Sequence, residues 1–251
     1  MRAVFFGSIG TIVETSELQR AAFNEAFLLH GLRWHWERGT YQSLLGQAGG
    51  AARIARYATQ KDERVDHISI HATKSRLFHR ALRARRLDLR PGVMDVCAWA
   101  KSRGMALALV TTTDRAIVAA LLEASFGADD VPFDLISAAD PSLKPKPSPD
   151  TYRKALADVD LDPGTVLAIE DNADGLKAAR AAGLTTVAFP GANTFATTVN
   201  RKGSPISSGE PRVSSERIDA DALATTDLLV TLSALLAFAP SRAPLANQLS
   251  V

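Results

Sequence analysis

Four short apolar runs along the chain predict buried β-strands. They cover residues 4–6, 107–110, 166–169 and 186–189, and each is continuous rather than alternating between apolar and polar positions. Strands that are covered on both faces have this pattern. Helical periodicity separates the later three runs, over residues 113–125 and 173–182, and Gly183 follows as a C-terminal cap. This alternation predicts an α/β fold, a Rossmann-like doubly wound parallel sheet with helices on both faces.

The interval between the first two runs has helical periodicity and no convincing strand. We expect helices over residues 16–29, 50–58 and 67–87. An all-helical block that follows the first strand of a sheet predicts an inserted cap domain, and residues 89–92 are the expected return hinge. The expected domains are an α/β core over residues 1–15 and 88–238 and a helical cap over residues 16–87.

The C-terminal part of the chain changes in composition. Residues 200–216 are rich in Ser, Gly, Pro, Arg and Lys, which predicts a flexible insertion in the core. Residues 218–238 regain helical periodicity and are expected to dock on the core. We expect residues 239–251 to form a flexible tail.

The charge and cysteine content exclude several classes of partner. The 251 residues carry 29 Lys and Arg against 27 Asp and Glu, a net charge of +2, so there is no global electrostatic reason to bind nucleic acid or membrane. The single cysteine, Cys97, excludes an intrachain disulfide and a cysteine zinc site. Because no apolar run resembles a signal peptide or a membrane span, we expect a cytoplasmic protein.

Polar residues that follow the predicted strands are the candidates for chemistry, because ligands of doubly wound sheets bind beyond the carboxyl ends of the strands. These residues are Thr111 and Thr112, Lys146 within a Lys-Pro-Ser-Pro-Asp segment, and the adjacent Glu170 and Asp171. Neighbouring carboxylates at the end of a buried strand are costly unless they are solvated, paired or bound to a cation such as Mg²⁺. A lysine and two acids at one sheet edge suggest phosphoryl chemistry with Mg²⁺.

The order and spacing of four segments resemble the motifs of the haloacid dehalogenase (HAD) superfamily. The segments are residues 3–15 (Ala-Val-Phe-Phe-Gly-Ser-Ile-Gly-Thr-Ile-Val-Glu-Thr), 110–111, 146–150 and 170–176. Residues 17–25, 34–36, 49–56, 74 and 89–92 also resemble the CbbY-like sugar-phosphate phosphatases, which are related to β-phosphoglucomutase. The resemblance covers about residues 1–195. It implies that Thr111, Thr112 and Lys146 bind phosphate, and that Asp171 with Glu170 holds Mg²⁺.

Two positions depart from the pattern of this superfamily. In its first motif one aspartate attacks phosphorus, and a second, two residues later, is the general acid and base. The resemblance places Gly7 and Ile9 at these positions, and neither side chain can do this chemistry. Ser8 lies between them, but side chains alternate in extended backbone, so we expect its hydroxyl to point away from the cleft with no base beside it.

The loss of the first aspartate also weakens the expected metal site, because the resemblance makes that carboxylate a Mg²⁺ ligand. An alternative is that Glu170 and Asp171 pair with Lys146 in a partly buried ion pair kept for structure. A third alternative is that Glu170 and Asp171 neither bind Mg²⁺ nor pair with Lys146. The sequence alone leaves all three alternatives open.

The cap departs from the same pattern. Gln19 stands where the resemblance expects a histidine, and the substrate loop Gly-Gly-Lys-Glu-Arg reads Gly-Gly-Ala-Ala-Arg over residues 49–53. The candidate substrate residues of the cap are therefore Gln19, Gly50, Arg53 and Lys74.

The leading hypothesis is a catalytically degenerate HAD-fold protein, a pseudophosphatase whose Thr111, Lys146 and Arg53 still bind a phosphorylated small molecule. One alternative is a weakly active hydrolase that uses water activated by a metal at Glu170 and Asp171. The other is a protein-interaction module that works through residues 200–216 or the open cleft. The sequence identifies no protein partner.

Overall fold

The computed structural model describes residues 1–45, 49–189 and 191. Its five strands form one sheet in the order β3-β2-β1-β4-β5, and every pair is parallel. The strands are β1 (Ala3–Phe6), β2 (Ala106–Val110), β3 (Leu135–Ser137), β4 (Val166–Glu170) and β5 (Thr185–Ala188). The predicted α/β class with a parallel sheet is confirmed. The short β3 is not among the predicted strands.

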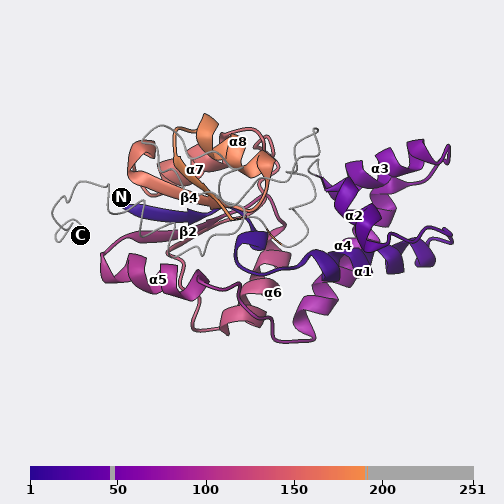
Figure 1. Cartoon of the computed structure of the whole chain (residues 1–251), viewed down its shortest axis with the longest axis horizontal. Helices are drawn as coiled ribbons and strands as arrows, with labels where there is room; N and C mark the ends of the chain where they lie inside the picture. Colours follow the sequence, from indigo (N-terminus) through magenta and orange to yellow (C-terminus); the bar gives the residue numbers. More distant parts are fainter. Residues whose placement is uncertain (46–48, 190, 192–251) are drawn as a thin grey trace, which may run out of the picture.

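Helices cover both faces of the sheet (Figure 1). On one side lie α5 (Val93–Ser102) and α6 (Arg115–Phe126), and on the other lie α7 (Asp150–Asp158) and α8 (Ala173–Ala181). Single turns of 3-10 helix follow β1 (Ile9–Thr11) and precede β4 (Pro163–Thr165). Because β1, β2 and β4 are buried on both faces, their sequences are almost continuous apolar runs.

Alternate residues of β1, β2 and β4 enter two separate hydrophobic cores. In β1, Val4 and Phe6 belong to the core beneath α5 and α6, whereas Ala3 and Phe5 belong to the smaller core beneath α7 and α8. All four residues are fully buried. This alternation fixes the register of the central strand, because a shift by one residue would exchange the two sets.

Four helices form a block between β1 and α5 in the chain, and this block lies beyond one end of the sheet (Figure 1). They are α1 (Ser16–Leu29), α2 (Arg38–Leu44), α3 (Gly50–Gln60) and α4 (His67–Arg83). An aromatic cluster holds the block together, and at its centre the rings of Phe23 and Trp36 lie 4.8 Å apart. The start and end of α1 agree with the predicted helix, whereas α2 is not predicted.

The division into a core and a cap domain stays a prediction, as do its boundaries at residues 15 and 88. The expected insertion over 200–216, the docked segment over 218–238 and the tail over 239–251 lie outside the described residues. Among the described helices, none has the length and apolar content needed to cross a membrane.

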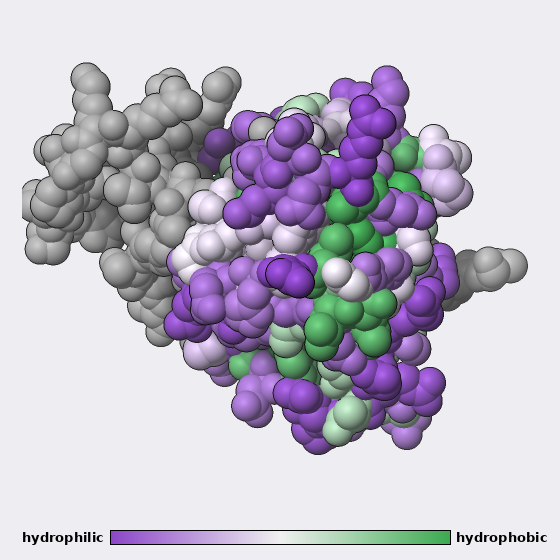
Figure 2. All heavy atoms as spheres, turned by 90° about the vertical axis from the view of Figure 1, so that its right-hand side faces the viewer, coloured by the Kyte–Doolittle hydropathy of each residue, from purple (hydrophilic) through white to green (hydrophobic). Residues whose placement is uncertain are grey.

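The helical block exposes apolar side chains at its surface. Leu28 and Leu29 at the end of α1 and Ile68 at the start of α4 are each more than half exposed. Figure 2, which faces this end of the molecule, shows apolar surface between hydrophilic regions. These exposed residues contrast with the buried aromatic side chains of the same helices.

Replacement of Phe23 by Ala is expected to destabilise the protein by ~3–5 kcal/mol, because the buried ring packs against Phe27, Trp36 and Tyr41. The matched control is Leu28→Ala on the same helix, where the side chain is 74% exposed and a change within ~0.5 kcal/mol is expected. Urea unfolding measures both. Equal effects of the two variants would contradict the described packing of α1.

Candidate functional site

The candidate site lies where the carboxyl ends of β1, β2 and β4 meet. The three strands pair in register, so Phe6 lies beside Leu109 on one side and Ile169 on the other. The chain then leaves β1 through Gly7, whose N–H donates to the Ile169 carbonyl at 2.8 Å. Polar side chains that follow these strands are consequently gathered at one edge of the sheet.

Lys146 lies at the centre of this edge and is 8% exposed. Its ammonium group donates to Glu170 Oε1 at 2.7 Å, to the Val110 carbonyl at 2.9 Å and to the Gly7 carbonyl. A lysine ammonium has three N–H donors. All three therefore have partners inside the protein, and the ammonium also lies 4.6 Å from the centre of the Tyr152 ring.

Glu170 is fully buried opposite this lysine. Its Oε1 accepts hydrogen bonds from Lys146 and, at 2.7 Å, from the Tyr152 hydroxyl, while its Oε2 has no hydrogen-bond partner among the described residues. Burial raises the pKa of Glu170, and the charge of Asp171 raises it further, while Lys146 opposes the shift. Burial, together with Glu170, also raises the pKa of the Tyr152 hydroxyl well above its ordinary value.

Two glycines make room for the Glu170 carboxylate. A Cβ atom at Gly7 would overlap the Glu170 carboxylate and the Tyr152 hydroxyl, and a Cβ atom at Gly175 would overlap the same carboxylate. The space that a side chain at position 7 would need is therefore filled by Glu170 and Tyr152.

The expectation that the Ser8 hydroxyl points away from the cleft and lacks a base is wrong. Ser8 Oγ donates to Asp171 Oδ1 at 2.8 Å and accepts a hydrogen bond from the Thr11 N–H at 3.2 Å. The regular strand already ends at Phe6, and Ser8 caps the 3-10 turn that follows. Because the backbone turns at this point, the alternation of an extended strand no longer applies.

The side chain of Ile9 belongs to the hydrophobic core and is 7% exposed. An apolar side chain is stable there, whereas a carboxylate would need a partner. Ile9 thus contributes to packing between β1 and the surrounding helices.

The two candidate threonines differ in their surroundings. Thr111 is 2% exposed, and its hydroxyl donates to Thr113 Oγ1 and accepts from the Thr113 N–H, both at 3.1 Å. Thr112 is exposed at the sheet edge. Phosphate binding by Thr111, Thr112 and Lys146 stays a prediction.

The residues predicted for the cap form a second polar cluster, within the helical block. Gln19 links Thr15 and Lys74, because its Nε2 donates to Thr15 Oγ1 and its Oε1 accepts from Lys74 Nζ, both at 3.0 Å. Arg53 is 7% exposed and donates to the Leu44 carbonyl. Gly50 allows a close approach of His71, whose imidazole a Cβ atom at Gly50 would overlap.

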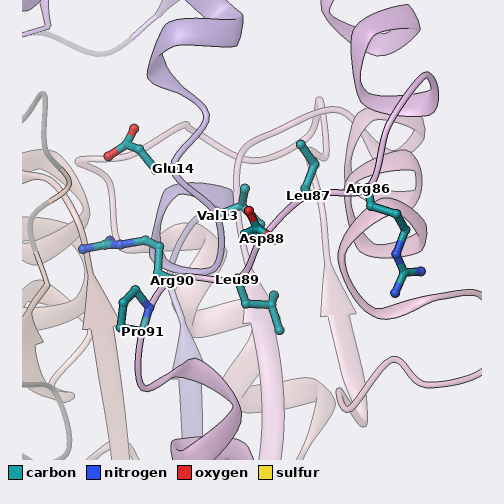
Figure 3. Close-up of a pocket in the computed structure, with 8 residues that line it drawn as sticks. All are labelled: Val13, Glu14, Arg86, Leu87, Asp88, Leu89, Arg90 and Pro91. Carbon is teal, nitrogen blue, oxygen red and sulfur yellow. The ribbon is translucent and has the colours of Figure 1, made fainter.

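Sequence reasoning placed Arg90 in the return hinge but did not predict that its side chain joins the hinge to the sheet edge. Its Nη1 donates to the Gly10 carbonyl at 2.7 Å and to the Phe189 carbonyl at 2.9 Å, and its guanidinium lies 3.5 Å from the centre of the Phe189 ring. Residues 13–14 and 86–91 line a cleft of about 370 Å³ at this hinge (Figure 3). The Pro-Gly hinge signal marks the segment but does not indicate which backbone carbonyls the arginine reaches.

Comparison with known proteins identifies the class to which this fold and site belong. A family model of haloacid dehalogenase-like hydrolases matches residues 1–183. Protein CbbY of Cereibacter sphaeroides is 42% identical over 196 residues, which cover 76% of this chain and 85% of that protein. The crystal structure of CbbY from Rhodobacter sphaeroides in complex with phosphate has a TM-score of 0.71 at 40% identity, and the match covers 78% of this chain and 88% of that one.

A second crystal structure, of a CbbY variant from Rhodobacter sphaeroides in complex with xylulose-(1,5)bisphosphate, also has a TM-score of 0.71 at 40% identity and covers 78% of this chain and 89% of that one. The chain belongs to the haloacid dehalogenase-like hydrolases and, within them, to the CbbY family.

Replacement of Lys146 by Met is expected to destabilise the protein by ~3–5 kcal/mol at pH 8, because it leaves the buried Glu170 carboxylate without its counter-ion. Without the lysine, the pKa of Glu170 rises further, so the folded protein retains a proton that the unfolded chain releases. Stability is then lost as the pH rises through the folded-state pKa, and the defect is smaller at pH 5. Chemical denaturation at both pH values measures this difference.

The double variant Lys146→Met, Glu170→Gln is the control for the charge of Glu170. It should recover part of the stability at pH 8 and lose most of the pH dependence of the single variant. A Lys146→Met defect that is the same at pH 5 and pH 8 would contradict the buried-pair account.

Proposed function

We propose that this chain binds a phosphorylated small molecule of the sugar-phosphate class and has lost the phosphoryl-transfer chemistry of its family. The binding half of the proposal is supported by the relatives, since CbbY has been solved with phosphate and a CbbY variant with xylulose-(1,5)bisphosphate. The proposed loss of phosphoryl transfer is supported by Gly7 and Ile9, which follow β1.

The observation that carries the loss of chemistry is the surroundings of Gly7. The family resemblance assigns this position to the nucleophilic aspartate, and here there is no side chain to attack phosphorus. The Glu170 carboxylate and the Tyr152 hydroxyl fill the space beside it. Ile9, at the position of the general acid and base, is packed in the core. Both groups that the family reaction needs are consequently replaced.

The carboxylates at this edge of the sheet are not arranged to hold a Mg²⁺ ion firmly, although the family implies a Mg²⁺-dependent phosphatase. Within residues 1–45 and 49–189, no three His, Cys, Asp or Glu side chains lie close enough together to hold a metal. Glu170 is committed to Lys146 and Tyr152, and Asp171 Oδ1 accepts from Ser8 and Asn172. We propose that Mg²⁺ affinity is weak and that Lys146 supplies the positive charge beside Glu170.

The proposed phosphate contacts are the Thr111 and Thr112 segment at the sheet edge and the basic side chains Arg53 and Lys74 of the helical block. Charged donors of this kind give strong hydrogen bonds to phosphate oxygens. Lys146 can join them only by giving up one of its three present partners, because its donors are all engaged. We therefore propose that Lys146 is first a structural residue of this edge.

The family relationship and the Ser8–Asp171 hydrogen bond favour a second candidate function, a weak hydrolase that depends on Asp171. In this candidate the carboxylate acts on bound water, with or without a metal ion. It predicts phosphate release that disappears in Asp171→Asn. Asp174→Asn, a change of a neighbouring acid in the first turn of α8, is the matched control.

The main proposal predicts that xylulose bisphosphate and related sugar phosphates raise the melting temperature of the protein without release of inorganic phosphate. The expected hydrolysis rate in the presence of Mg²⁺ is lower than that of an active family member by on the order of 10⁴ or more, as for loss of a nucleophile. Thermal-shift titration and a phosphate-release assay on the same preparation test both halves. Turnover that is abolished by Asp171→Asn would support the second candidate instead.

A further prediction concerns the space beside Gly7. Gly7→Ala is expected to cost ~1–3 kcal/mol of stability, because the new methyl group meets the Glu170 carboxylate and the Tyr152 hydroxyl in the core. Gly39→Ala is the control, since no atom lies within 4 Å of its Cβ position in α2 and a gain of ~0.5–1 kcal/mol is expected. Urea unfolding compares the two variants.

The same crowding makes the double variant Gly7→Asp, Ile9→Asp insufficient to restore hydrolysis. The Glu170 carboxylate must move before an aspartate fits at position 7, and the second aspartate removes an apolar residue from the core. Recovery of Mg²⁺-dependent phosphatase activity in this double variant would contradict the proposal that the surrounding site has closed around the glycine.

A further inference from the structure

Ser8 and Asp171 form a hydrogen-bonded pair at the carboxyl edge of the sheet. Ser8 Oγ donates to Asp171 Oδ1 at 2.8 Å, and both residues are partly exposed. Lys146 and Glu170, at the same edge, are instead buried and bound to each other. A hydroxyl within hydrogen-bond reach of a carboxylate is the arrangement of a nucleophile and its base. The Ser8–Asp171 pair therefore combines this arrangement with access from solvent.

Two neighbours fix the orientation of the Ser8 hydroxyl. Its hydrogen is directed to Asp171, and its oxygen accepts from the Thr11 N–H at 3.2 Å. A serine hydroxyl has one hydrogen and two lone pairs. The hydrogen bonds found among the described residues thus leave one lone pair for attack on an electrophile. The Thr11 N–H also stabilises the negative charge that develops on the oxygen as the proton leaves.

The Asp171 carboxylate is itself held in place. Asn172 Nδ2 donates to the same Asp171 Oδ1 at 2.7 Å, and Asn172 Oδ1 caps α8 by accepting from the Gly175 N–H at 2.9 Å. A Cβ atom at Gly10 would overlap Asp171 Oδ2, so the glycine lets the carboxylate approach the turn that carries Ser8. Nucleophile, base and orienting group are consequently all present.

Two positive charges lie beside the turn that carries Ser8. Lys146 donates to the Gly7 carbonyl, and Arg90 donates to the Gly10 carbonyl at 2.7 Å. A cationic side chain therefore contacts the backbone on each side of Ser8. Their charges attract a phosphate dianion toward the hydroxyl.

The side chain of Ile9 limits the class of phosphoryl donor. It is packed in the core and has no proton to donate. In an in-line displacement the leaving oxygen lies opposite the attacking oxygen, so a proton that passes from Ser8 to Asp171 is on the wrong side of phosphorus to reach it. A sugar alkoxide leaves poorly without a proton, whereas a carboxylate leaves as a stable anion. The matching donor is an acyl phosphate, the mixed anhydride of a carboxylic acid and phosphoric acid.

We propose that Ser8 is a phosphorylation site, at which the chain takes one phosphoryl group from an acyl phosphate with Asp171 as the proton acceptor. This inference rests on the proposed function, because the phosphate group of the donor is bound at the same edge of the sheet. It adds a covalent product, a phosphoserine, between the two positions at which Gly7 and Ile9 replace the aspartates of the family.

The transfer balances without a further reactant. The bond between Ser8 Oγ and phosphorus forms while the bond between phosphorus and the acyl oxygen breaks, and the carboxylate leaves with the electron pair of that bond. The proton of the hydroxyl passes to Asp171 and then to water. Hydrolysis of the product needs a base for the attacking water, and Ile9 supplies none, so the phosphoserine persists.

The experiment is incubation of the full chain with acetyl phosphate, followed by measurement of the intact mass and fragmentation of the N-terminal peptide. The wild type is expected to gain the mass of one phosphoryl group, located on Ser8. Hydroxylamine treatment identifies the linkage, because it cleaves an acyl phosphate on an aspartate and leaves phosphoserine intact.

Three variants assign the roles. Ser8→Ala should gain no phosphoryl group, and Asp171→Asn should gain it more slowly by on the order of 10²–10⁴. Ser142→Ala is the matched control, because Ser142 Oγ also donates to a carboxylate oxygen, Asp140 Oδ1 at 2.6 Å, in an exposed pair outside the site. It should be modified like the wild type. Fragmentation of the wild-type peptide decides the position even if Ser8→Ala folds poorly.

The outcomes separate this inference from the proposed function. If acetyl phosphate adds no phosphoryl group, or if the added group lies on another residue or is released by hydroxylamine, phosphorylation of Ser8 is wrong. A rise in melting temperature with xylulose bisphosphate on the same preparation would then still support the proposed function. If the sugar phosphate also fails to bind, both fail.

Discussion

The structure of the candidate site depends on the buried ion pair between Lys146 and Glu170. Two charges removed from water at the end of a sheet are costly unless pairing and hydrogen bonds offset the loss of water. The carbonyls of Gly7 and Val110 bond the ammonium and the hydroxyl of Tyr152 bonds Glu170 Oε1, while Oε2 has no hydrogen-bond partner among the described residues. The pair thereby joins the ends of β1, β2 and β4 to the segment that precedes α7, and any side chain added at position 7 must compete with it.

Under the proposed function, this constraint explains why no reactive side chain is accommodated at position 7 although the chain has the family's architecture. Gly7 and Gly175 lie where a Cβ atom would overlap the Glu170 carboxylate, so the acid occupies the space between them. Ser8 turns instead toward Asp171, and Ile9 enters the core. The polar side chains of this edge bind one another, an arrangement that agrees with the proposed function of recognition without bond cleavage.

Local patterns were sufficient to predict the parallel sheet, the helical block and the meeting of the strand ends. The fully buried strands have continuous apolar runs, and α1 has an apolar face with a polar boundary at each end. The direction of the Ser8 hydroxyl was not predictable, because it depends on where the strand stops and the 3-10 turn begins. The contacts of Tyr152 and Arg90 join segments far apart in the sequence, so no local pattern reports them. Because β3 has only three residues, its apolar run is too short to be distinguished from a loop by sequence.

Lys146 is thus a positively charged centre whose donors are all engaged within the protein. The central claim is that a phosphorylated sugar binds to this protein and remains intact. Phosphorus NMR of xylulose bisphosphate with a stoichiometric amount of the protein and Mg²⁺ tests it most directly. The account predicts shifted or broadened phosphate resonances and no inorganic phosphate after hours of incubation. A growing inorganic phosphate resonance, absent from a sample of Asp171→Asn, would contradict it.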